Sequence, residues 1–163
     1  MGIKPSDLRA NVAAWLRKRL PYLYPTWDIQ VCGSCGDNLS GFLKSSGLLD
    51  AFPCSEAFEM ELDITGVLRR GTEAQLVFVG CKTSPITLGD VGPMQEYSSL
   101  ALPVLSIILS PAGMSPCLGL LLNTYNRMDV LEYGSGKRLK IGTWDVNRNQ
   151  VDPASVIPPG ELG

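Results

Sequence analysis

The chain of 163 residues contains no histidine. This absence excludes Ser-His and Cys-His nucleophilic pairs, histidine general bases and zinc sites that need imidazole ligands. Any catalysis must therefore use carboxylates, lysine, cysteine, tyrosine or a metal ion. Charge is also sparse, because charged residues make up 18% of the chain, below the ~25% of an average domain. The net charge is −2, so no bulk electrostatic field favours nucleic acid or an anionic membrane.

A second absence is a run without any charged residue, from Tyr97 to Asn126. A membrane helix needs about 20 uninterrupted apolar residues, whereas prolines and glycines divide this run into shorter pieces. Two of the pieces, 104–110 and 118–124, are suited to strands buried on both faces. We therefore expect core strands here and no membrane association. The N-terminus has no apolar signal-peptide core, which favours an intracellular, cytoplasmic protein.

The length and the 45% hydrophobic content are sufficient for one domain with a substantial core. We expect this domain to cover residues 1–152, with its core at 58–124. Residues 153–163 are rich in proline and glycine and are expected to form a flexible C-terminal tail.

Three segments have helical patterns. Ser6 is a candidate N-cap for a first helix, whose apolar residues recur at helical spacing until Pro21, where we expect the helix to end. A short second helix is expected over 41–52. Thr87 with an aspartate three residues later predicts the start of a third helix over 88–100.

Strand patterns begin at Phe58. Apolar and acidic residues alternate over 58–64, which predicts a half-buried strand with a carboxylate-lined face. Residues 75–81 are almost all apolar and suit the centre of a sheet. Further buried strands are expected at 104–110 and 118–124, and edge strands at 130–133 and 139–146. Together these elements predict an α/β fold, a single domain with a central mixed sheet flanked by helices.

The first two expected strands bring acidic residues near a lysine. Glu61 and Asp63 share one face of the first strand, and the second ends in Gly80-Cys81-Lys82. Because Mg²⁺ and Mn²⁺ prefer oxygen ligands, Glu61 and Asp63 form a candidate metal-binding pair. In an antiparallel hairpin that turns near Arg70 and Gly71, Asp63 is expected opposite Phe78. This register places Lys82 on the carboxylate side.

An acidic strand, a turn, an apolar strand that ends in lysine and a following helix resemble the PD-(D/E)XK nuclease superfamily, which includes archaeal Holliday-junction resolvases and many restriction endonucleases. The resemblance rests on ELDITG at 61–66, LVFVGCK at 76–82 and GDVGPMQEYSSLA at 89–101. It implies a restriction-endonuclease-like core and a Mg²⁺- or Mn²⁺-dependent nuclease that hydrolyses DNA phosphodiester bonds. Many relatives dimerise, so a homodimer is also implied.

By this resemblance, Asp63 takes the place of the metal-binding aspartate and Lys82 that of the motif lysine. The lysine would position or activate the attacking water and offset charge on the phosphate. Gly80, however, stands where the motif has an acid two residues before the lysine. Glu61 from the same face, or Glu96 from the next helix, would have to supply that carboxylate. A second interpretation is therefore a catalytically degenerate nuclease fold that binds nucleic acid or a partner protein.

Basic residues that could contact the DNA backbone occur in two groups, one on the first helix and one near the C-terminus. They are Arg9, Arg17, Lys18, Arg19, Lys137, Arg138 and Lys140. A solvated helix face is the alternative interpretation of the first group. A basic first helix in an acidic chain indicates that any DNA contact depends on local patches and not on net charge.

The five cysteines support a third interpretation, a zinc-stabilised interaction domain. Cys32 and Cys35 form a CxxC turn, and eighteen residues separate Cys35 from Cys54. Without histidine, zinc would need a fourth thiolate from Cys81 or Cys117. Both of these lie in apolar sequences, where a buried and inert thiol is the common outcome.

Overall fold

A mixed β-sheet of six strands is the centre of the computed structural model, which describes residues 2–33, 38–52, 55–134 and 136–159. The strands are β1 (Asp28–Gly33), β2 (Ile64–Arg70), β3 (Glu73–Cys81), β4 (Leu105–Ser110), β5 (Lys140–Asp145) and β6 (Gln150–Val151). They lie in chain order across the sheet. The first three form an antiparallel meander, β3, β4 and β5 are parallel, and β6 is antiparallel to β5.

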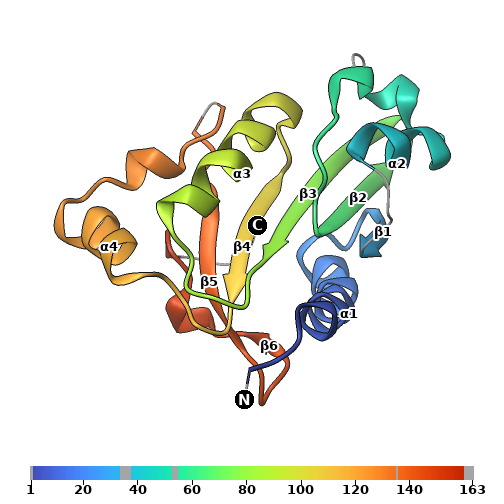
Figure 1. Ribbon diagram of the computed structural model, residues 1–163. Coiled ribbons are helices and arrows are strands. Elements are labelled where there is room, and N and C mark those ends of the chain that lie inside the picture. The colour runs from blue at the N-terminus through green and yellow to red at the C-terminus, as the bar shows by residue number, and fades with distance from the viewer. Residues whose placement is uncertain (1, 34–37, 53–54, 135, 160–163) are drawn as a thin grey trace.

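Helices cover both faces of this sheet (Figure 1). They are α1 (Pro5–Leu23), α2 (Leu39–Ser45), α3 (Leu88–Ala101) and α4 (Pro116–Gly119), which continues into a π-helical turn over Leu120–Thr124. The short 3₁₀ helices are Leu49–Ala51, Ser55–Ala57, Met128–Leu131 and Pro153–Ser155. The predicted α/β domain with a central mixed sheet and flanking helices is confirmed.

The sheet separates two apolar cores because alternate residues of each strand point to opposite faces. On β3, Leu76 and Phe78 pack with α2 and α3, whereas Val77 and Val79 pack with α1. All four side chains are at most 1% exposed. The nearly continuous apolar sequence of β3 is therefore explained by burial on both faces, as the sequence predicts.

α1 packs an apolar stripe, which includes Val12, Leu16 and Leu20, against the sheet. It begins with Pro5 at the first helical position, so the prediction of Ser6 as the cap is wrong by two residues. Pro21 lies inside the last turn of the helix, so the helix end expected at this proline is wrong by two residues. The helix ends after Leu23, where the Tyr24 N–H donates to the Leu20 carbonyl at 2.8 Å.

Trp15 of α1 connects the helix to β5, on the same face of the sheet. Its ring makes an edge-to-face contact with that of Trp144 on β5, at a centroid distance of 5.8 Å and an interplanar angle of 82°. Trp144 is 1% exposed. Such aromatic pairs stabilise a packing arrangement beyond the area that they bury, so α1 is anchored at β5 as well as at β1 and β3.

Residues 58–63 correct one prediction, because the strand starts only at Ile64. Phe58 and Met60 are buried, as their alternation with acidic residues predicts. Their carbonyl groups, however, accept hydrogen bonds from Ser40 N–H (2.8 Å) and Leu39 N–H (2.9 Å) at the start of α2. The alternation of buried apolar and acidic residues over 58–63 is thus produced by an extended segment whose carbonyl groups accept hydrogen bonds from the N-terminus of α2.

Residues 118–124 are helical, so the strand predicted there is wrong. Ser115 caps α4 by accepting a hydrogen bond from the Leu118 N–H at 3.2 Å, and Pro116 occupies the first helical position. This start signal decides the structure, because a short buried apolar run has the same composition in a helix as in a strand. Residues 128–131 likewise form a 3₁₀ helix in place of the strand expected at 130–133.

The remaining predictions divide between confirmed elements and one difference. The strand expected at 104–110 is β4, and the helix expected at 88–100 is α3, with the capping box at Thr87. The strand expected at 139–146 is β5, but it lies between β4 and β6 and is not an edge strand. In the part of the chain that the structure describes, no helix is long and apolar enough to span a membrane.

Residues 153–159, expected to be part of a flexible tail, pack against the sheet. Val156 is 4% exposed. Ile157 exchanges two backbone hydrogen bonds with Ile141 of β5, at 2.8 and 2.9 Å. This segment therefore contributes to the α1 side of the core through Val156.

Candidate active site

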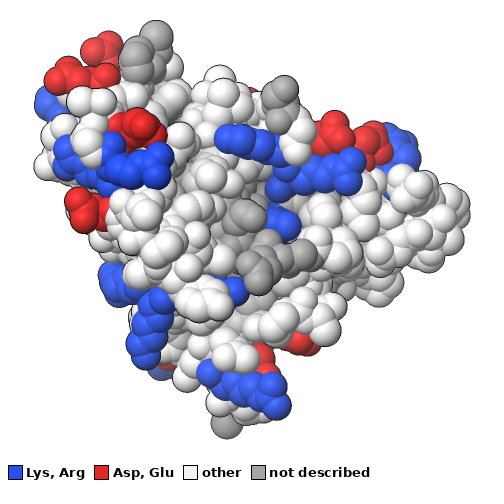
Figure 2. Space-filling model, turned by 180° about the vertical axis from the view of Figure 1, so that it is seen from behind, with Lys and Arg blue, Asp and Glu red and all other residues white. Residues whose placement is uncertain are grey.

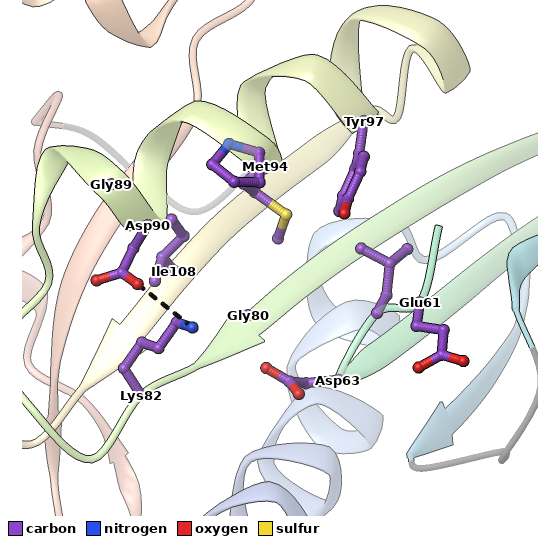
Figure 3. A pocket seen from close by; sticks show the side chains of 11 residues that line it. Glu61, Asp63, Gly80, Lys82, Gly89, Asp90, Met94, Tyr97 and Ile108 are labelled. Carbon is purple, nitrogen blue, oxygen red and sulfur yellow. Dashed lines mark ion pairs between the residues drawn. The ribbon is translucent and has the colours of Figure 1, made fainter. Parts of the chain in front are cut away.

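A pocket of about 260 Å³ lies where β3 ends and α3 begins (Figure 3). Its acidic and basic lining residues are Glu61, Asp63, Lys82 and Asp90. Gly80, Met94 and Tyr97 are among its other lining residues. Three residues that the sequence identifies as candidates, Glu61, Asp63 and Lys82, are therefore brought together by the fold.

Asp63 is fixed at the end of β3. Its Oδ2 atom accepts a hydrogen bond from the Cys81 backbone N–H at 2.8 Å. Among the described residues, Oδ1 has no hydrogen-bond or ion-pair partner. The carboxylate is thus oriented by one oxygen and offers the other to a ligand.

The register of the hairpin differs from the prediction by two residues. Ile64 is paired with Val79, so Asp63 lies next to Gly80 and not opposite Phe78. The cause is the position of the turn: Gly71, with a φ of +60°, and Thr72 form a two-residue connection between the paired residues Arg70 and Glu73. Because a shift of two residues preserves the face of every side chain, Lys82 still lies on the pocket side.

Lys82 is held by an acid from the neighbouring helix. Its Nζ atom lies 3.3 Å from Asp90 Oδ1, and its backbone N–H donates to the Leu109 carbonyl at 2.9 Å. Asp90 Oδ2 also accepts hydrogen bonds from the N–H (2.9 Å) and Oγ1 (3.1 Å) of Thr87, which complete the capping box. Desolvation of Asp90 opposes its ionisation, but the Thr87 hydrogen bonds and the Lys82 charge outweigh it and lower the Asp90 pKa.

Neither of the two acids expected to compensate for Gly80 faces Lys82. Figure 3 shows the Glu61 carboxylate turned away from Lys82 and Asp90. Glu96 is exposed and does not line the pocket. The acid that reaches the lysine is Asp90, which the sequence identifies only as a helix cap, because its contact with Lys82 depends on how α3 packs on β3.

Gly80 leaves space at the position of the motif acid. A Cβ atom built on Gly80 would lie 3.4 Å from Met94 Cε and 3.7 Å from Ile108 Cγ1. The first atom is the end of a flexible side chain, so a larger residue at position 80 could be accommodated by a rotation of Met94. No carboxylate lies at this position, but the backbone does not forbid one.

Cys81 contacts Asp63 through its backbone N–H and directly precedes Lys82, but its thiol is not suited to act as a nucleophile. Burial, and secondarily the charge of Asp63, raises the pKa of the Cys81 thiol to about 12, although the Arg9 charge acts in the opposite direction. The thiolate is the reactive form of cysteine. The site therefore depends on carboxylates and lysine, as the lack of histidine predicts.

The pocket offers few protein ligands for a metal ion. Within residues 2–33, 38–52, 55–134 and 136–159, no group of three or more acidic or cysteine side chains is placed to hold one. Mg²⁺ is usually bound by one or two carboxylates, and water and substrate phosphates complete its coordination. Asp63 Oδ1 and the Glu61 carboxylate, which has no ion-pair partner among these residues, fit this smaller requirement.

The basic residues of α1 do not form one surface. Arg9 and Arg17 line a groove beside β1, whereas Lys18 lines a different one together with Arg148. The Arg19 guanidinium lies over the Tyr22 ring, 4.8 Å from its centroid. Figure 2 shows basic side chains in separate patches, with uncharged and acidic residues between them.

The basic residues near the C-terminus are partly engaged within the molecule. Arg138 forms an ion pair with Glu132 at 3.1 Å. Lys140 is half-buried, which lowers its pKa, and its Nζ atom lies 3.5 Å from the Pro158 carbonyl oxygen. Among the described residues, the Lys137 side chain has no ion pair or hydrogen bond. DNA binding by this group stays a prediction.

The zinc prediction rests mainly on residues that the structure does not describe. Cys32 lies on β1, whereas Cys35 and Cys54 lie outside the described residues. Cys81 and Cys117 are free, and Cys117 is exposed on α4. A zinc site at Cys32, Cys35 and Cys54 therefore stays a prediction.

Comparison with known proteins identifies no family for this chain. The chain matches no model of a protein family, no curated protein and no solved structure.

Proposed function

We propose that this chain is a Mg²⁺- or Mn²⁺-dependent nuclease domain with a restriction-endonuclease-like core, which hydrolyses DNA phosphodiester bonds in the pocket at the end of β3. The observation that carries the proposal is the meeting of Asp63 and Lys82 in one pocket, although a hairpin separates them in the sequence. An acidic segment, a turn, an apolar strand that ends in lysine and a capped helix follow one another. This is the order that the PD-(D/E)XK resemblance implies.

Asp63 and Glu61 are the residues that would hold the divalent cation. When bound, such a cation polarises the scissile phosphate and lowers the pKa of a coordinated water. Asp63 is suited to this role because its hydrogen bond from Cys81 N–H fixes the carboxylate while Oδ1 stays accessible. Glu61 would turn toward Asp63 from its exposed position.

Lys82 supplies the positive charge for the phosphate. Its ammonium group can donate hydrogen bonds to phosphate oxygens and offset the negative charge that develops during hydrolysis. Asp90 holds the ammonium group through one of its oxygens, at 3.3 Å, and is itself fixed by the capping box. The lysine is thereby kept beside the pocket without a partner at position 80.

The proposal is tested by cleavage of labelled single-stranded, duplex and branched DNA with Mg²⁺, Mn²⁺ or EDTA. Asp63→Asn keeps an acceptor for the Cys81 N–H, and Lys82→Met keeps the length of the side chain. Each should reduce the cleavage rate about 10²-fold or more, whereas the exposed control Lys44→Met should not. Cleavage that needs no metal, or that survives both substitutions, would contradict the proposal.

Gly80→Glu extends the same experiment in the opposite direction. The new carboxylate would enter the pocket beside Met94, where the motif acid is missing. If the missing ligand limits metal binding, this variant should cleave at a lower Mg²⁺ concentration than the wild type. An unchanged metal requirement would show that position 80 does not contribute.

A catalytically degenerate nuclease fold that binds DNA is the second candidate. It is favoured by Gly80 and by the Lys82–Asp90 ion pair, which already neutralises the lysine. In this case the wild type should bind DNA but cleave none of the substrates at any metal concentration. Asp63→Asn should then leave the affinity unchanged.

A further inference from the structure

A groove of about 350 Å³ runs between α1 and the end of β1. It is lined by Ser6, Arg9, Ala10, Ala13, Arg17 and Gly33. Gly33 and Ala13 allow β1 and α1 to pack closely at the groove, since a Cβ atom on Gly33 would lie only 3.3 Å from the Ala13 Cβ. The groove thus combines a hydroxyl and two guanidinium groups with small apolar residues.

Within the described part of the chain, the two arginines use little of their hydrogen-bonding capacity. Arg9 is partly buried, yet among the described residues its side chain has no hydrogen-bond or ion-pair partner. Arg17 donates one hydrogen bond, from Nη2 to the Val31 carbonyl at 3.3 Å. A guanidinium group has five N–H donors, so both side chains can still bind an anion. Their spacing of eight residues places them on one face of α1.

The groove lies at the same end of the sheet as the pocket. Gly33 is paired across the sheet with Ile64, the residue that follows Asp63. Arg9 and Asp63 are also both close enough to Cys81 for their charges to act on its thiol. Figure 3 shows α1 passing beneath Asp63, in agreement with this placement.

We propose that Arg9 and Arg17 bind backbone phosphates of the DNA strand that continues past the end of β3 into the pocket. The inference rests on the proposed function, because it takes the pocket as the place where that strand is cut. Arginine matches phosphate geometry with paired hydrogen bonds. Residues 1–20 contain five basic groups against one acid, so this local charge can attract DNA although the whole chain is acidic.

The structure also distinguishes these two arginines from their neighbours on the same helix. Arg19 lies over Tyr22, and Lys18 lines the groove on the other side of α1. A double variant of Lys18 and Arg19 therefore removes the same charge from the same helix without changing the groove. It is the matched control for a double variant of Arg9 and Arg17.

The test measures binding of a fluorescent 20-nucleotide single strand and its duplex by anisotropy in EDTA, where metal-dependent cleavage is suppressed. R9Q/R17Q should weaken binding at least tenfold. It should also reduce the slope of log K against log[salt] by about 1.4 for the single strand, since each lost phosphate contact contributes roughly 0.7. K18Q/R19Q should change the slope by less than half of that amount. Far-UV circular dichroism confirms that both variants retain α1.

Three outcomes would overturn the inference: equal losses in both double variants, no loss in R9Q/R17Q, or binding of inorganic phosphate without DNA. The result is separable from that of the cleavage experiment. If the protein binds DNA through Arg9 and Arg17 but cleaves none, the role of the groove is supported and the nuclease proposal is contradicted. If the R9Q/R17Q variant binds and cleaves DNA as well as the wild type does, the nuclease proposal is supported and the role of the groove is contradicted.

Discussion

Cys81 and Cys117 show how the surroundings of a residue decide its chemistry. Burial raises the pKa of Cys81 to about 12, so at pH 8 only about one thiol in ten thousand is ionised. Cys117 is exposed. We expect iodoacetamide to alkylate Cys117 at least tenfold faster than Cys81 in the folded protein, as measured by mass spectrometry of the peptides. In denaturant the two rates should converge, and equal rates in the folded protein would contradict the assignment.

The candidate site could be predicted from sequence only where it depends on spacing. Asp63 and Lys82 meet because strand residues alternate between faces, and this alternation survives an error of two residues in the register. The Lys82–Asp90 ion pair could not be predicted, because it depends on the packing of α3 against β3. The exposed positions of Glu61 and Glu96 depend on the same tertiary contacts.

Elements are predictable where the local sequence allows one structure. β3 and β4 follow from apolar runs of strand length, and α3 follows from its capping box. Residues 118–124 could not be assigned by hydrophobicity, because the Ser115-Pro116 start signal alone separates a helix from a strand. Residues 58–63 show the converse, a strand-like burial pattern in a segment that pairs with the start of α2.

The capping box of α3 gives a prediction at the element scale. Thr87→Ala should lower the free energy of unfolding by about 1 kcal/mol, the usual cost of a lost N-cap. Asp90→Asn should cost roughly 0.5 kcal/mol at neutral pH, because solvent screens its charge interactions. Urea denaturation measures both, and Glu96→Gln on the exposed side of α3 is the control.

The effect of Asp90→Asn should depend on pH. The pKa of Asp90 is lowered in the folded protein, so its charge stabilises the fold above the unfolded value near 3.9 and loses this effect as the pH falls through the folded value. The difference from the wild type should be constant between pH 5 and 7 and shrink below about pH 4. A difference that grows at low pH would contradict the role of Asp90.

At the scale of the whole molecule, the last described segment completes the core. Val156 is buried and Ile157 is hydrogen-bonded to Ile141. A chain that ends at Asp152 should lose about 3 kcal/mol of unfolding free energy, from one buried side chain and two backbone hydrogen bonds. Val156→Ala in the full chain should lose about 2 kcal/mol. Unchanged thermal midpoints in both would show that the segment does not stabilise the sheet.

The edge-to-face pair of Trp15 and Trp144 has a practical consequence. α1 carries both the arginines of the groove and one of the two indoles, while the other belongs to the fixed body of the sheet. If DNA binds in the groove as we propose, a movement of α1 on binding would change the relative orientation of these rings. The near-UV dichroism of the pair would then report this movement without an added label.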